Sequence, residues 1–141
     1  MLIGGAFRSE YLEPDMEIVR ETAQGLRSEA TSVDERRLLV ASGSRARASA
    51  VVETIKETIG NDDTVVVSDR GLNSDELGFD HTGELLGTTH DCIVVDCHDT
   101  YRPNAIGQAT GAVDGGGLLV LLTPPLNEWP DTNGRFDEVL A

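Results

Sequence analysis

The chain has 141 residues, enough for one domain with a hydrophobic core, and 39% of them are apolar although only 4% are aromatic. Asp and Glu number 25 against 11 Lys and Arg, which gives a net charge of −14, and Lys56 is the sole lysine. This balance argues against a domain that grips nucleic acid or anionic lipid by bulk positive charge. Because the acidic residues are scattered among apolar segments, they favour a protein adapted to a salt-rich cytoplasm over one with an acidic tail.

The sequence predicts a cytoplasmic protein with no membrane contact. No window approaches the roughly 18 apolar residues of a membrane span. The apolar start of the chain, residues 1–7, lacks the positive flank of a signal peptide. Two cysteines, Cys92 and Cys97, do not form a disulfide framework.

The first half of the chain predicts a leading helix, a strand and a second helix. The helix covers about residues 14–28, with Val19, Ala23 and Leu26 facing inward. A continuous apolar run at 37–41 indicates a strand that ends in a Ser-Gly-Ser turn. Ser42 or Ser44 would then cap a helix that ends at Gly60, and its buried stripe comprises Ala48, Val51, Val52, Ile55 and Ile59.

The second half repeats the alternation. Strands are expected at 64–67, 92–95 and 118–122, and the link at 72–89 reads as a loop with a short helix near 83–86. Pro103 suits the first position of a helix, and three successive glycines at 115–117 would end it. The buried stripe of this helix comprises Ala105, Ile106, Ala109, Ala112 and Val113.

These elements predict an α/β fold: a three-layer, doubly wound, Rossmann-like domain with a mainly parallel sheet of about four strands. The strands are continuously apolar, which is typical of strands buried on both faces, and helices alternate with them. We expect a single domain over 1–141, with its core at about 33–125. Residues 126–141 read as a loop carrying Trp129 and the truncated start of a further element.

Polar residues follow the predicted strands, at the edge where ligands bind in open α/β sheets. The candidate ligand-binding rim comprises Ser42, Gly43, Ser44, Arg45, Asp69, Arg70, Asp96, His98 and Asp99. The Ser42 to Arg45 turn could receive a phosphate at a helix start, but a serine-capped turn explains it as well. Asp96 could hold magnesium, yet a turn acid that bonds nearby backbone is the plainer interpretation.

No complete catalytic motif accompanies this rim. The sequence has no Gly-Lys pair, hence no P-loop, and neither G-x-G-x-x-G nor G-x-S-x-G. His90, Cys92, Cys97 and His98 are zinc-type ligands, but Cys92 and Cys97 are an odd number of positions apart and would face opposite sides of a strand. We therefore expect no metal site, and Cys92 in the core.

Three segments together resemble one known domain. They are residues 87–96 (GTTHDCIVVD), 102–107 (RPNAIG) and 115–125 (GGGLLVLLTPP), and residues 36–47 and 64–70 fit the same pattern. Over about 33–129 the chain is similar to the N-terminal domain of the tRNA(Met) cytidine acetyltransferase family.

This resemblance implies a non-catalytic accessory domain. Enzymes of that family acetylate N4 of a cytidine in RNA with acetyl-CoA and ATP. Their N-terminal domain precedes a helicase-like ATPase module with a P-loop, a GNAT acetyltransferase domain and an RNA-binding tail. The resemblance thus implies no cofactor in this segment, acetyl-CoA and ATP with magnesium in the parent enzyme only, and packing on the ATPase module.

The expected partners are the helicase-like and acetyltransferase domains of the same parent chain, and tRNA. For RNA contacts the candidates are Arg45, Arg47, Arg70 and Arg102, each of which could equally be a solvated surface arginine.

Two alternative functions stay open. One is a stand-alone nucleotide- or cofactor-binding Rossmann-like protein that uses the strand-end rim, and the other is a pure interaction domain.

Overall fold

The computed structural model describes residues 2–4, 15–60, 63–99 and 101–125. Trp129 and the further element expected after it lie outside these residues. Within them, no helix combines the length and apolar character needed to cross a membrane.

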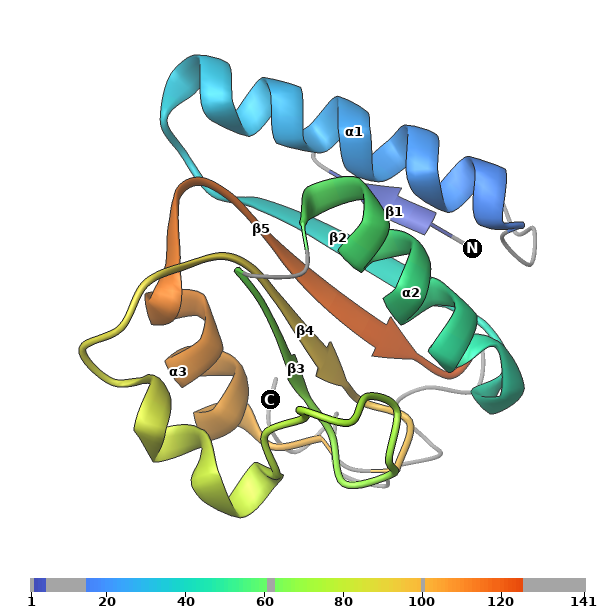
Figure 1. Ribbon diagram of the computed structural model, residues 1–141, viewed down its shortest axis with the longest axis vertical. Helices are drawn as coiled ribbons and strands as arrows, with labels where there is room; N and C mark the ends of the chain where they lie inside the picture. Colours follow the sequence, from blue (N-terminus) through green and yellow to red (C-terminus); the bar gives the residue numbers. More distant parts are fainter. Residues whose placement is uncertain (1, 5–14, 61–62, 100, 126–141) are drawn as a thin grey trace, which may run out of the picture.

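A five-stranded sheet forms the centre of the domain, in the order β1-β2-β5-β4-β3 (Figure 1). Strands β2, β5, β4 and β3 run parallel, and β1 pairs antiparallel with β2. The predicted Rossmann-like α/β fold with a mainly parallel sheet is confirmed, while β1 was not anticipated. The strands are β1 Leu2–Gly4, β2 Arg37–Ser42, β3 Thr64–Val67, β4 His90–Asp96 and β5 Val113–Thr123.

Helices cover the two faces of the sheet and complete three layers. Figure 1 shows α1 and α2 on one face and α3, with the yellow-green η2, on the other. Alternate strand residues feed two cores: Leu39 and Val94 pack under α1 and α2, whereas Ile93 and Leu121 pack under α3 and η2. The helical elements are α1 Met16–Val33, η1 Arg45–Arg47, α2 Ala48–Ile59, η2 Phe79–Leu85 and α3 Pro103–Ala112.

Helix α1 begins where the Asp15 side chain accepts a hydrogen bond from Ile18 N at 2.8 Å. It continues past the expected end near residue 28, because Ala30 extends the buried stripe by another turn. The helix ends at Asp34, whose φ of 55° leaves the helical region.

The start of α2 differs from the prediction of a serine cap. Ser44 stands before the short η1 turn and makes no capping hydrogen bond through its side chain. Ser42 belongs to β2, where its hydroxyl donates to the carbonyl of Pro124 at 2.9 Å. Gly60 does cap the other end of α2, with a φ of 122° that favours glycine.

The three glycines at 115–117 lie inside β5 and do not terminate α3 as expected. Between the paired positions His90/Val113 and Cys92/Leu118, β5 advances five residues while β4 advances two. The extra residues bulge out, and Gly116 adopts a φ of 86° there. The glycines therefore permit the irregular pairing between β4 and β5.

Candidate functional site

The connections at the carboxyl edge of the sheet diverge next to β5. The chain leaves β2 toward α2 on one face, and it leaves β4 toward α3 on the opposite face. Because β5 stands between β2 and β4, a crevice opens over its end. This is the place where open α/β sheets accept ligands.

Strand pairing brings the three strand ends to one level. Ser42 pairs with Thr123, and Asp96 pairs with Leu122 one step below. Backbone bonds continue the sheet into the loops: Gly43 N donates to Thr123 O at 3.0 Å, and Cys97 N donates to Leu122 O at 2.7 Å. The walls of the crevice are thus tied to the sheet.

The crevice holds a pocket of about 350 Å³. One wall is the turn after β2, the second is the segment after β4, and the third is the pair of prolines after β5. Its lining comprises Gly43, Ser44, Arg45, His98, Asp99, Pro124 and Pro125. The sequence prediction missed the two prolines, although their position directly after the last predicted strand was a usable signal.

Asp96 is the centre of a buried polar network beneath the pocket, and only 3% of it is exposed. Its carboxylate accepts hydrogen bonds from Arg70 Nε at 2.6 Å and Arg70 Nη2 at 3.1 Å. Ser68 Oγ donates to it at 3.1 Å, and the backbone N of His98 does so at 3.2 Å. Asp96 therefore bonds nearby backbone, as the plainer interpretation held, and also joins the ends of β3 and β4.

Burial of Asp96 alone would raise the pKa of its carboxyl, because it disfavours the charged form. Hydrogen bonds from His98 and Arg70, together with the charge of Arg70, outweigh burial and hold the pKa well below its usual range. Asp96 is thus an ionised carboxylate with its charge compensated inside the protein.

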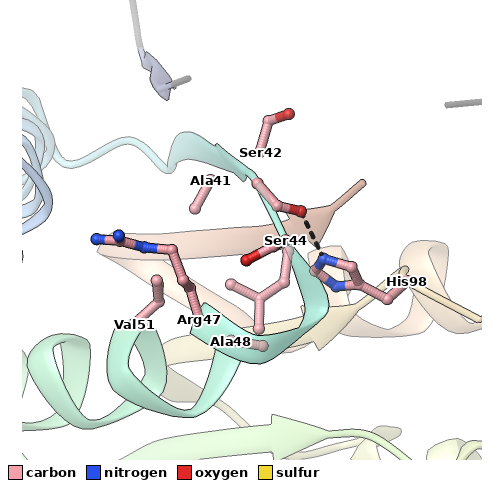
Figure 2. Close-up of a pocket in the computed structure, with 9 residues that line it drawn as sticks. Ala41, Ser42, Ser44, Arg47, Ala48, Val51 and His98 are labelled. Carbon is pink, nitrogen blue, oxygen red and sulfur yellow. Dashed lines mark hydrogen bonds between the residues drawn. The ribbon is translucent and has the colours of Figure 1, made fainter. Parts of the chain in front are cut away.

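His98 links this network to the turn after β2. Its side chain is 3% exposed. Nδ1 lies 3.0 Å from Asp96 Oδ1, and Nε2 lies 3.0 Å from the carbonyl oxygen of Gly43. Figure 2 shows the ring reaching the turn, beside a smaller hollow lined by Ser42, Arg47 and Val51.

Arg45 and Asp99 form an ion pair at the mouth of the pocket. Both are substantially exposed, at 60% and 42% of their side chains. Asp99 also lies 3.9 Å from Arg70 Nε. The outer pair and the inner Asp96 network are therefore neighbours that share one arginine.

Seven of the nine predicted rim residues line the pocket or belong to the network below it, and Ser42 lines the smaller hollow beside them. Asp69 turns away, because its Oδ1 accepts from the backbone N of Phe79 at 3.1 Å and so fixes the start of η2. Ser68 was not among the candidates, although it follows the apolar run of β3 directly and contacts Asp96.

The four candidate arginines for RNA contact occupy different environments. Arg70 is 14% exposed in its pair with Asp96, whereas Arg45 lies at the surface with Asp99. Arg102 bonds Asp80 at 3.1 Å and stacks over the Phe79 ring at 5.4 Å. Arg47 is partly buried beside the smaller hollow.

The two cysteines are buried on opposite faces of the sheet, as the sequence predicted: Cys92 packs under α1 and α2, and Cys97 packs under α3 and η2. Burial raises the pKa of each thiol to about 12. Among the residues that the structure describes, no group of three or more His, Cys, Asp or Glu side chains is arranged to hold a metal ion.

Comparison with known proteins gives one consistent match. The profile of the family described as tRNA(Met) cytidine acetyltransferase TmcA, N-terminal, matches residues 15–141. A Haloferax volcanii protein named tRNA(Met) cytidine acetyltransferase TmcA is 41% identical over 132 residues, which are 92% of this chain and 17% of the relative. The protein of the same name from Haloarcula marismortui is 41% identical over 125 residues, 86% of this chain and 16% of the relative. That from Thermococcus kodakarensis is 36% identical over 76 residues, 54% of this chain and 9% of the relative. The chain thus spans no more than 17% of the length of these relatives.

Proposed function

Because the chain belongs to the N-terminal family of the tRNA(Met) cytidine acetyltransferases TmcA, we propose that it is the accessory N-terminal domain of an RNA cytidine N4-acetyltransferase. In this role it packs on the helicase-like ATPase module of its parent chain and helps to present tRNA. Acetyl-CoA and ATP with magnesium act in the parent's other domains. The observation that carries the proposal is the family match over 15–141, against relatives that are several times longer.

The strand-end rim supports a structural role for this domain. Its charged groups satisfy one another: Asp96 is compensated by Arg70, and Asp99 by Arg45. Side chains paired in this way hold loops in place.

A domain replacement in the Haloferax volcanii relative tests the proposal. The region that aligns with this chain is deleted, or is exchanged for this chain, and acetylation of cytidine in tRNA(Met) is measured in cells. We expect the deletion to abolish acetylation and the exchange to restore it, because the two sequences are 41% identical over 132 residues. Full acetylation after the deletion would contradict the accessory role.

RNA presentation is tested by binding of tRNA to the same exchanged protein. Arg45 and Arg102 are the exposed candidates, so R45Q and R102Q should each weaken binding a few-fold and reduce the salt dependence by about one phosphate contact. R20Q is the matched control, because Arg20 lies on α1 in an exposed pair with Glu17. If R45Q, R102Q and the control R20Q all bound tRNA with equal affinity, RNA contact through Arg45 and Arg102 would be contradicted.

We also propose a second candidate function, a nucleotide- or cofactor-binding domain, which the pocket of about 350 Å³ at the carboxyl edge favours. Thermal unfolding of the 141-residue chain with ATP, acetyl-CoA or NAD tests it. Ligand at 100 times its Kd should add about 2.7 kcal/mol to the free energy of unfolding. An unchanged melting temperature with all three would exclude this function for these ligands.

A further inference from the structure

The pocket at the carboxyl edge of the sheet places two opposite charges beside an apolar wall. Arg45 and Asp99 form an ion pair at its mouth, and Pro124 and Pro125 form the wall that follows β5. A ligand in this pocket would therefore meet a cation, an anion and an apolar surface close together. This combination narrows the chemical class of the ligand.

Much of the remaining polar lining is already bonded within the protein. Each ring nitrogen of His98 has a partner at 3.0 Å, Asp96 Oδ1 for one and the carbonyl oxygen of Gly43 for the other. Ser44 makes no capping bond through its side chain. The polar side chains of the lining that a ligand can engage are Ser44, Arg45 and Asp99.

The Arg45–Asp99 pair can open at small cost. The two side chains are 60% and 42% exposed, and an exposed ion pair contributes little to stability because water competes for both groups. Opening the pair frees a guanidinium, which only donates hydrogen bonds, and a carboxylate, which only accepts them. The pair can therefore be exchanged for two contacts with one ligand, an acceptor group at Arg45 and a donor group at Asp99.

The volume of the pocket limits the size of this ligand. A volume of about 350 Å³ lies near the lower end of the range of roughly 300–1,000 Å³ that ligand sites span. A mononucleotide suits such a pocket better than the much longer NAD or acetyl-CoA. It also supplies the required groups, because its phosphate accepts hydrogen bonds, its base has a flat face for the prolines, and the edge of the base can carry donors.

Among the common bases, guanine fits the carboxylate best. A carboxylate has two acceptor oxygens, and guanine presents two neighbouring donors, the ring N1–H and the amino group at C2. Adenine and cytosine each place an acceptor nitrogen beside their amino group, and uracil presents one N–H between two carbonyl oxygens. Only guanine can therefore donate to both oxygens of Asp99 at once.

We propose that the pocket binds one guanine nucleotide unit, which rests on nucleotide binding, the second of the two proposed functions. The N1–H and the amino group of guanine donate to the carboxylate of Asp99, and the base packs against Pro124 and Pro125. The guanidinium of Arg45 and the hydroxyl of Ser44 donate to the phosphate. The Arg45 side chain is long and 60% exposed, so its guanidinium can turn from the carboxylate to a phosphate at the mouth.

Binding of mononucleotides to the 141-residue chain tests the base contact. Calorimetry measures the Kd of GMP, IMP and AMP, and amide shifts of Ser44 and Asp99 locate the site, with Gly60 at the end of α2 as reference. IMP lacks the amino group at C2, and AMP presents an acceptor at N1. We expect GMP to bind about tenfold more tightly than IMP, because IMP loses one hydrogen bond to a charged group, and AMP to bind more weakly still.

D99N should exchange the base specificity. Its amide keeps one acceptor for N1–H but presents a donor in place of the second acceptor. Xanthine carries a carbonyl oxygen where guanine carries the amino group, so D99N should bind XMP at least as tightly as GMP, whereas the wild type should prefer GMP about tenfold. D80N is the matched control, because Asp80 forms an exposed pair with Arg102 at 3.1 Å, and it should keep the wild-type preference.

R45Q tests the phosphate contact. It should weaken binding of GMP a few-fold and leave binding of guanosine unchanged, because only GMP has a phosphate for the guanidinium. R20Q removes an arginine from an exposed pair on α1 and should change neither affinity.

A short RNA with one guanosine among uridines distinguishes the source of the nucleotide. Binding tighter than that of GMP assigns the pocket to a guanosine within RNA, and weaker binding assigns it to a free nucleotide. Either result supports the shared chemistry.

Other outcomes would overturn the proposal. Equal affinities for GMP, IMP and AMP would contradict the choice of guanine and leave nucleotide binding standing. A D99N variant that still prefers GMP to XMP, or amide shifts that spare Ser44 and Asp99, would contradict the placement of the base. No binding of any mononucleotide would contradict both the guanine assignment and the nucleotide-binding function.

Discussion

Gly117 is the position at which an added methyl group should harm the fold most clearly. A Cβ there would stand 2.7 Å from the carbonyl oxygen of Asp91 on β4 and 2.8 Å from that of Asp114 on β5. Both atoms belong to the backbone, so Gly117→Ala can be accommodated only if β4 moves away from β5 and the backbone of β5 itself also shifts, at a place where the pairing is already irregular. Overpacking of this kind costs about 1–3 kcal/mol.

Gly107→Ala is the matched control. Gly107 lies within α3, and a Cβ there would meet nothing within 4 Å. Alanine has a higher helix propensity than glycine, so this variant should be more stable by about 0.5–1 kcal/mol. The same chemical change thus has opposite predicted signs at two glycines ten residues apart in the chain.

Urea unfolding followed by circular dichroism measures both effects, and thermal unfolding checks them at about 3–5 °C per kcal/mol for a chain of this size. The slope of unfolding free energy against urea should stay unchanged, so that the midpoint reports stability. Equal stability of G117A and the wild type would show that β4 and β5 yield at no cost, and would refute the close-approach argument.

The remaining predictions concern acid, salt and thiols. The pKa of Asp96 is lower in the folded chain than its ordinary value of 3.8. Its contribution to stability is therefore complete above pH 3.8 and is lost as the pH falls toward the pKa that Asp96 has in the folded chain. The urea midpoint should drop on acidification below pH 3.8, and it should drop less steeply in D96N. The net charge of −14 should make the melting temperature rise with KCl into the molar range, and a melting temperature independent of salt would refute the halophilic interpretation. Cys92 and Cys97, with their pKa raised to about 12, should resist a thiol reagent in the folded chain and react once urea unfolds it; fast labelling of the native protein would contradict their burial.

The parallel sheet was predictable because its strands are buried on both faces. Ile93, Val94 and Val95 carry no alternation, since each face of β4 packs against a helical layer. Helix stripes such as Val19, Ala23 and Leu26 were predictable for the corresponding reason.

The glycines at 115–117 show why element boundaries were harder. Three successive glycines are a common helix ending, and only the register between β4 and β5 reveals that they belong to a bulged strand. Likewise, Ser44 precedes a helix as a capping residue should, but the η1 turn comes first, and there the amide of Arg47 donates to the backbone carbonyl of Ser44 while the Ser44 side chain makes no capping bond.

The rim was predictable as a location, whereas its pairing was not. That polar residues after parallel strands meet at one edge follows from the fold class. Which of them bond is a tertiary result: Arg70 and Asp96 are 26 positions apart, and His98 and Gly43 are 55 apart. No spacing rule links residues at such distances.

The ion pairs of these arginines determine how much free energy it would cost each of them to contact RNA instead. A phosphate at Arg45 must displace Asp99, and an exposed ion pair of this kind is worth only about 0–1 kcal/mol. At molar salt the screening length falls to about 3 Å, which weakens both this ion pair and a phosphate contact at Arg45. Arg70 differs, because removing it from Asp96 would leave a buried carboxylate without its guanidinium, a change that typically costs about 3–5 kcal/mol. Among the four candidate arginines, RNA contact is therefore expected at the exposed Arg45 and Arg102, whereas Arg70 is held in its pair with Asp96.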